Sequence, residues 1–196
     1  MKKSSKIILG AVCLSSATLL LTGCDLKLTT TKNNDAKSQE TTKEQKSKGN
    51  CKVFDCIKKI EITDSLDKVN SIMGFEGEQT NEGNGWKKYT WKLNDDDSVM
   101  VTIYDSGSGT VNIDFDNDSI KNSKVDFSGF ADLKKDINGG GTVTYDTMKS
   151  TFKAEGTLIE KSSFSNKYRW VNGDGGYMDA SFSLSSGKCT FAMGRY

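Results

Sequence analysis

Apolar and polar residues alternate over several short stretches in the middle of the chain. A period of two is typical of a strand that buries one face of a sheet. Four-residue polar or glycine-rich segments at 94–97 and 106–109 separate these stretches and suit hairpin turns. The predicted strands are Trp86–Leu93, Val99–Tyr104 and Thr110–Phe115, and a fourth is predicted over Lys121–Phe127.

Before these strands, apolar residues recur every three or four positions, which is the spacing of a helix. Ile57 and Ile60 mark a short first helix. A second helix has Thr63 as its candidate N-cap and Gly74 as its stop. Its apolar stripe consists of Leu66, Val69, Ile72 and Met73.

The same order of elements returns in the last third of the chain. Helices are predicted over Phe130–Ile137 and Thr144–Phe152. The strands predicted after them are Thr157–Lys161, Lys167–Val171, Gly176–Leu184 and Lys188–Met193. Because the helices are grouped apart from antiparallel strands, the predicted fold class is α+β.

Two tetrapeptides indicate that this order is an internal repeat. Lys88–Trp91 reads KYTW, and Lys167–Trp170 reads KYRW 79 residues later. The same offset aligns the helices 66–73 and 145–152. After one deletion, an offset of 78 places Val111, Ile113 and Phe115 opposite Cys189, Phe191 and Met193, while the strand before them matches imperfectly. The sequence predicts two tandem repeats, 51–128 and 129–196, each with two short helices packed on three to four strands.

The first 23 residues have the layout of a secretion signal. Three lysines precede the apolar run Ile7–Leu21, whose 15 residues fall short of the roughly 20 that a membrane-spanning helix needs. Leu21–Cys24 reads LTGC and resembles the lipobox of bacterial lipoproteins, in which the cysteine receives a diacylglycerol before cleavage. We therefore expect residues 1–23 to be removed. Cys24, carrying acyl chains such as palmitate, would then anchor the protein to the extracytoplasmic face of the cell membrane.

The segment 24–50 is predicted to be a tether. After Cys24 it is dense in Lys, Thr, Asn, Gln, Ser and Glu and has almost no large apolar residues, so it cannot bury enough surface to offset the entropy of ordering. As a flexible coil it would reach roughly 25–30 Å from the membrane. A charged helix over 35–48 is the alternative, although its pattern has no apolar stripe.

The charge of the chain and its lack of histidine exclude or disfavour several classes of function. The chain from Cys24 onward has a net charge of −2, which argues against a nucleic-acid partner. The chain has no histidine, so catalytic triads with histidine and the usual zinc ligands do not apply. This lowers the expectation of an enzyme without excluding one.

The cysteines and the acidic residues do not form a recognisable metal-binding motif, and two of the cysteines are candidates for a disulfide. With Cys24 acylated, three thiols remain, and Cys51 and Cys56 are close enough in sequence for a disulfide if their segment is not a regular helix. Cys189 reads as a buried small hydrophobe. No metal or cofactor is expected, because Asp114–Asp118 lacks the glycine and the glutamate of a calcium loop.

Tandem copies of this size, each with two short helices before a Tyr-x-Trp strand, resemble the beta-lactamase inhibitory protein (BLIP) family and a wider fold group that includes bacterial lipoproteins. The resemblance covers residues 51–196. It implies a fold that binds other proteins through a concave, aromatic-rich sheet face, with an acidic hairpin residue entering the partner. The turn Asp95, Asp96 and Asp97 resembles that hairpin, whereas the histidines of the family's binding face have no counterpart here.

Strand alternation selects the candidate binding residues. It assigns Tyr89, Trp91 and their in-register neighbours to the core and the intervening residues to the opposite face. The outward candidates are Trp86, Lys88, Met100, Tyr104, Arg169 and Tyr177, with the acidic turn 95–97 as a further candidate. Tyr, Trp, Met and Arg are enriched at protein interfaces.

These features predict a membrane-tethered, non-enzymatic protein-binding module of the cell envelope. Its partners would be the membrane, through Cys24, and an unidentified envelope or extracellular protein. The alternatives are an envelope hydrolase using carboxylate or serine chemistry and an inhibitor of beta-lactamase. A solute-capturing lipoprotein is disfavoured, because such proteins need two larger lobes around a cleft.

Overall fold

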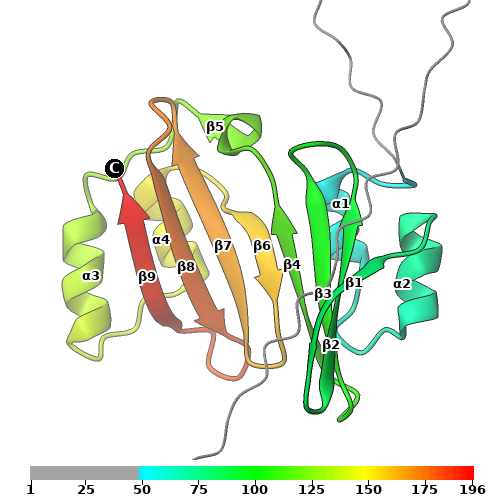
Figure 1. The fold of residues 1–196 in the computed structure, drawn as a ribbon. Coiled ribbons are helices and arrows are strands. Elements are labelled where there is room, and N and C mark those ends of the chain that lie inside the picture. The colour runs from blue at the N-terminus through cyan, green and yellow to red at the C-terminus, as the bar shows by residue number, and fades with distance from the viewer. Residues whose placement is uncertain (1–48) are drawn as a thin grey trace, which may run out of the picture. The chain divides into compact units, whose positions relative to one another are not determined.

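Two groups of strands join edge to edge in one sheet (Figure 1). The computed structural model describes residues 49–196, and in this range the α+β fold has four α-helices and nine strands. The sheet order is β1-β2-β3-β4-β6-β7-β8-β9 with all neighbours antiparallel, and the short β5 pairs in parallel with the end of β7. The predicted signal peptide, Cys24 and the tether up to residue 48 lie outside the described residues.

The elements follow one another in two similar series. The first is α1 (Val53–Lys59), α2 (Leu66–Met73), β1 (Glu78–Gly83), β2 (Trp86–Lys92), β3 (Ser98–Tyr104) and β4 (Gly109–Asp114), followed by a 3-10 turn (Asn117–Ile120) and β5 (Lys121–Asn122). The second is α3 (Phe130–Asn138), α4 (Tyr145–Phe152), β6 (Thr157–Lys161), β7 (Ser165–Asn172), β8 (Tyr177–Ser183) and β9 (Cys189–Arg195). The two series meet where β4 pairs with β6.

The helices pack on one face of the sheet and enclose two hydrophobic cores. The first core gathers α1, α2 and the inward residues of β2–β4 around Trp91, which is fully buried. The second gathers α3, α4 and the inward residues of β7 and β8 around Trp170. Among residues 49–196, none of the helices has the length and apolar content needed to cross a bilayer.

Each tryptophan indole donates to an equivalent backbone carbonyl, and that of Trp91 also donates to Asn70 Oδ1 at 3.1 Å. The indole N–H of Trp91 donates to the carbonyl of Phe75 (3.1 Å), and that of Trp170 donates to the carbonyl of Ala154 (2.9 Å). A glycine lies against each ring, because a Cβ on Gly77 or Gly156 would approach ring carbons to 2.4 Å or 2.6 Å. The Tyr-x-Trp strands are therefore central to both cores.

The predicted helices are confirmed, with one correction at a cap. Ser65, not Thr63, caps α2, since its hydroxyl accepts a hydrogen bond from the Lys68 backbone N–H. Gly74 ends α2 in the left-handed conformation, as its position predicted. The preference for Ser and Thr at N-caps does not discriminate between two such residues that are two positions apart.

Two strand predictions differ from the structure. The edge strand β1 was not predicted, because all six of its residues are exposed and its sequence has no apolar alternation. The strand predicted over Lys121–Phe127 is only the two-residue β5; Val125 and Phe127 instead belong to the second core, and an Asn122 turn leads the chain away from the sheet.

The register of the last two strands also corrects the sequence alignment. Inward residues of β8 are Met178, Ala180 and Phe182, so the offset from β3 remains 79 and does not become 78. A bulge between Ser181 and Phe182 then shifts β9, pairing Phe191 with Ser181 and Met193 with Asp179 on the outward face. The alignment of these two residues with core positions of β4 was therefore wrong.

Candidate functional site

The sheet face that points away from the four helices is the candidate functional surface, called here the outer face. The strand registers align one row of its side chains from β2 to β9. This row consists of Thr90, Met100, Asn112, Glu160, Lys167, Ser181 and Phe191. Both hydrophobic cores lie on the opposite side, and no helix among residues 49–196 packs on the outer face.

At one end of the outer face, β2 and β3 bring together two predicted aromatics. Trp86 and Tyr104 are directly paired across the two strands, and Lys88 lies one row further along. Tyr104 is 38% exposed, whereas the Trp86 ring lies over Gly83. Met100 lies two rows beyond Tyr104, so four of the predicted binding residues share one continuous strip.

At the other end, β7 and β8 hold an arginine cluster. The Arg169 guanidinium donates from Nε and Nη2 to the two carboxylate oxygens of Asp179, both at 2.7 Å, and from Nη1 to Asn117 Oδ1 at 3.0 Å. It lies 4.7 Å from the ring centre of Tyr177 and 5.8 Å from that of Phe115. The hydrogen bonds that Arg169 donates to Asp179 raise the pKa of the guanidinium above its usual value.

The hydrogen bonds of this cluster fix the positions of the side chains on the β7–β8 part of the outer face. All three guanidinium nitrogens of Arg169 have partners within the protein, and Asp179 is buried beneath them. Tyr177, also predicted as a binding residue, has one ring face against the guanidinium. A partner that approached here would meet a preformed assembly of rings and charges in place of flexible side chains.

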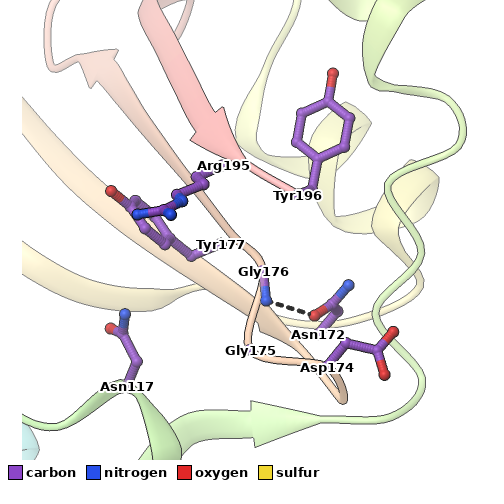
Figure 2. A pocket seen from close by; sticks show the side chains of 8 residues that line it. All are labelled: Asn117, Asn172, Asp174, Gly175, Gly176, Tyr177, Arg195 and Tyr196. Carbon is purple, nitrogen blue, oxygen red and sulfur yellow. Dashed lines mark hydrogen bonds between the residues drawn. The ribbon is translucent and has the colours of Figure 1, made fainter.

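A polar pocket of about 590 Å³ opens beside the cluster (Figure 2). Its lining comes from the 3-10 turn, the β7–β8 hairpin and the end of β9, and comprises Asn117, Asn172, Asp174, Gly175, Gly176, Tyr177, Arg195 and Tyr196. The Gly176 N–H donates to Asn172 Oδ1 at 2.8 Å, which closes the β7–β8 hairpin where it lines the pocket. Sequence reasoning did not find this pocket, because its walls come from three separate segments.

Phe191 and Met193 were also missed as outward residues. They are 47% and 52% exposed, and both stand on the edge strand β9. Together with the Trp86–Tyr104 pair they give the outer face large apolar side chains at both of its lateral margins. They face outward because of the bulge of β9, and the sequence contains no distinct signature of that bulge.

The acidic turn lies apart from the Trp86–Tyr104 pair. It connects β2 to β3 at the end of these strands opposite to Trp86. Asn94 Oδ1 accepts the backbone N–H groups of Asp96 (2.8 Å) and Asp97 (2.6 Å), and its amide donates to the Asp97 carboxylate (2.9 Å). The two candidate regions therefore do not form one site.

The cysteines lie outside these regions. A disulfide joins Cys51, just before α1, to Cys56 within it, with a Cα–Cα distance of 5.5 Å. Cys189 is a free thiol at the start of β9, and burial against the second core raises its pKa. Within the described part of the chain, no group of three or more possible ligand residues could hold a metal ion.

Comparisons with models of protein families, with curated proteins and with solved structures give no match to this chain. The functional argument therefore depends on the geometry of the outer face and on the sequence.

Proposed function

We propose that this chain is a membrane-tethered, non-enzymatic protein-binding module of the bacterial cell envelope, and that it binds its partner through the outer face. One observation carries the proposal: a sheet eight strands across has helices on one side and, on the other, an uncovered face with large apolar residues toward both margins. Exposed Trp, Tyr, Phe and Met side chains of this kind are enriched at protein interfaces, where they contact a partner together with polar residues.

Two carboxylates on this face, on β6 and β8, are held in ion pairs, which favours a role in recognition over one as general base. Asp179 forms its ion pair with Arg169, and Glu160 forms one with Lys167 at 2.6 Å. A general base needs a carboxylate available to accept the substrate's proton. Ion-paired carboxylates instead fix the shape and charge of a recognition surface.

The proposed architecture is two tandem repeats of the BLIP-like type. Three structural features recur at an offset of 79 residues and support it. The indole donors are Trp91 and Trp170, and the carbonyls that accept from them belong to Phe75 and Ala154. The strand bulges begin at Gln79 and at Leu158. In such an arrangement each repeat supplies half of one sheet, and a single binding face extends across both.

The proposal includes acylation of Cys24. The lipobox-like LTGC at 21–24 supports it, since none of the other cysteines follows an apolar run that ends in two small residues. Replacing Cys24 with serine should abolish labelling with palmitate and release the protein from the membrane fraction. Continued labelling of the Cys24→Ser protein would contradict the lipobox assignment.

The outer face is tested by separating binding from stability. The variant carries Trp86→Ala, Tyr104→Ala and Phe191→Ala, and the matched control carries Phe164→Ala, which removes an exposed ring away from the outer face. Partners are crosslinked in the envelope, identified, purified and titrated against each protein. We expect the triple variant to unfold near the wild-type temperature and to lose at least about tenfold in affinity, because buried interface aromatics each contribute about 2 kcal/mol or more.

The control should bind like the wild type. A folded triple variant with unchanged affinity for the purified partner would contradict the proposal. A panel of beta-lactamases provides the specific check on the resemblance to the inhibitory family, since inhibition by the wild type and not by the triple variant would identify the partner class.

A further inference from the structure

Two large apolar side chains stand in solvent at the tips of neighbouring hairpins. Phe164, between β6 and β7, is 82% exposed, and Leu184, between β8 and β9, is 55% exposed. The Leu184 backbone N–H donates to the Phe164 carbonyl at 2.9 Å, which holds the two tips side by side. Both hairpins project from the same end of the sheet (Figure 1).

The tips are held by their own backbone hydrogen bonds. Ser162 donates its backbone N–H to the Ser165 carbonyl (3.0 Å), and its hydroxyl accepts the backbone N–H of Phe164 (3.3 Å). In the other tip, Gly187 donates its backbone N–H to the Ser183 carbonyl (2.8 Å). The apolar side chains are thus presented on closed turns, and neither is part of a core.

The first series of elements, from α1 to β5, provides an internal comparison. The same backbone hydrogen bond joins its corresponding hairpins, from Asp105 N–H to the Gly85 carbonyl at 2.9 Å. These residues precede Leu184 and Phe164 by 79 positions. Because glycine and aspartate form the same backbone hydrogen bond, that bond does not require a phenylalanine and a leucine there, and their exposure calls for another explanation.

We propose that the Phe164–Leu184 tip inserts into the interfacial layer of an anionic lipid membrane. Aromatic and aliphatic side chains gain free energy when they leave water for the boundary between headgroups and acyl chains. Around them the tip is rich in serine, and the segments 161–167 and 183–188 contain three lysines and no acidic residue. Within these two segments, therefore, no carboxylate opposes the approach of a negatively charged surface.

The distribution of the lysines supports an anionic lipid. Lys161 pairs with Glu61 (3.0 Å) and Lys167 with Glu160 (2.6 Å), whereas Lys188 is exposed and no ion pair within residues 49–196 includes it. Its ammonium group is available to a lipid phosphate. A convex tip with two protruding side chains suits a deformable lipid layer, while the broad outer face suits a protein.

This site is independent of the outer face proposed for protein binding. It would add a second, weak contact to the acyl anchor, and two linked contacts bind more tightly than either alone. The tip is tested without the anchor in a protein of residues 49–196, which contains both hydrophobic cores, and a cooperative thermal unfolding transition verifies first that this protein folds by itself.

The experiment measures sedimentation of the 49–196 protein with vesicles of phosphatidylcholine alone and of phosphatidylcholine mixed with phosphatidylglycerol. The test variant combines Phe164→Ser with Leu184→Asp, the latter reproducing the aspartate of the first half. The matched control combines Phe191→Ser with Met193→Ser, which removes two similarly exposed apolar side chains from the outer face. Thermal unfolding verifies that all three proteins are folded.

We expect the wild type and the control to bind the phosphatidylglycerol vesicles and the tip variant to bind at least about tenfold more weakly. Tryptophan in place of Phe164 should show a blue-shifted emission when these vesicles are added. Equal sedimentation of the tip variant, or no sedimentation of the wild type, would overturn the proposal. Loss of protein capture by the tip variant without any vesicle binding by the wild type would likewise overturn it, and would identify the tip as a protein contact.

Discussion

Truncation of Trp170 to alanine tests the structural basis of the sheet most directly. The indole is buried, donates to the Ala154 carbonyl at 2.9 Å, and packs against Phe152 and Tyr145 with ring centroids at 5.5 Å and 5.8 Å. Loss of a buried tryptophan typically costs about 3–5 kcal/mol through lost burial and the cavity that remains. The carbonyl left without its donor adds about 1 kcal/mol.

The expected loss is therefore about 4–6 kcal/mol, a large part of the roughly 5–15 kcal/mol that stabilises a typical domain. For a domain of this size that corresponds to a fall of about 10 °C or more in the unfolding temperature. Trp91→Ala should be similarly destabilising, since its indole is buried and donates to the Phe75 carbonyl. Trp86→Ala should cost about 1 kcal/mol or less, because this ring lies on the outer face.

The assay is urea unfolding followed by far-ultraviolet circular dichroism, which does not depend on the tryptophans themselves. Destabilisation by Trp86→Ala as large as that by Trp170→Ala would refute the assignment of inward and outward faces. Losses below about 1 kcal/mol for all three variants would refute the claim that the Tyr-x-Trp strands organise the cores.

Three further outcomes follow from particular contacts. Asp179→Asn breaks the bidentate ion pair with Arg169 and should cost about 3 kcal/mol in urea unfolding, because a mostly buried guanidinium is left without its counter-charge. Gly156→Ala should cost about 1–3 kcal/mol, since its Cβ would lie 2.6 Å from the indole beneath it, whereas Gly173→Ala, whose Cβ would lie 3.4 Å from its nearest neighbour, should be tolerated. Alkylation of Cys189 should reach its half-maximal rate at a higher pH in the folded protein than in denaturant, because burial raises the pKa of the thiol; an unshifted pH profile would contradict this.

Much of the fold could be predicted because the residues of the central strands alternate regularly between apolar side chains that face the core and mostly polar side chains that face away from it. Alternation in β2, β3 and β4 gave both the strands and their buried faces, and Trp91, Val99 and Val111 are fully buried as expected. The edge strand β1 could not be found in this way. An edge strand exposed on all its residues is formed by the pairing of its backbone with β2, and hydrophobic periodicity contains no information about that pairing.

The outer face was less predictable because it depends on contacts between distant segments. Arg169 and Tyr177 were selected for their residue types and strand parity. The structure places the arginine against Asp179 across the neighbouring strand and against Asn117, which lies 52 residues earlier. Phe191 and Met193 face outward because a one-residue bulge shifts the register of β9, and no residue type in that strand marks the bulge in advance.

The difference between the two halves of the sheet leads to a gain-of-function prediction. Asp105, in the β3–β4 hairpin, occupies the position that Leu184 occupies in the β8–β9 hairpin, and both hairpins lie at the same end of the sheet. If the Phe164–Leu184 tip enters an anionic membrane, the first half must tilt away from the surface, because an aspartate is repelled by it and pays a cost for leaving water. Asp105→Leu should therefore strengthen sedimentation with phosphatidylglycerol vesicles several-fold.

Asp105→Asn separates the two causes, since it removes the charge without adding apolar surface. Binding in the order leucine, asparagine, aspartate at position 105 would mean that both burial and charge repulsion act at this end of the sheet. The substitution lies outside the outer face and both cores, so capture of a protein partner and the unfolding temperature should remain unchanged. Identical vesicle binding by all three proteins would show that position 105 does not limit the approach to the lipid, and the inferred tilt would then be wrong; the role of the Phe164–Leu184 tip itself is decided by the Phe164→Ser, Leu184→Asp variant.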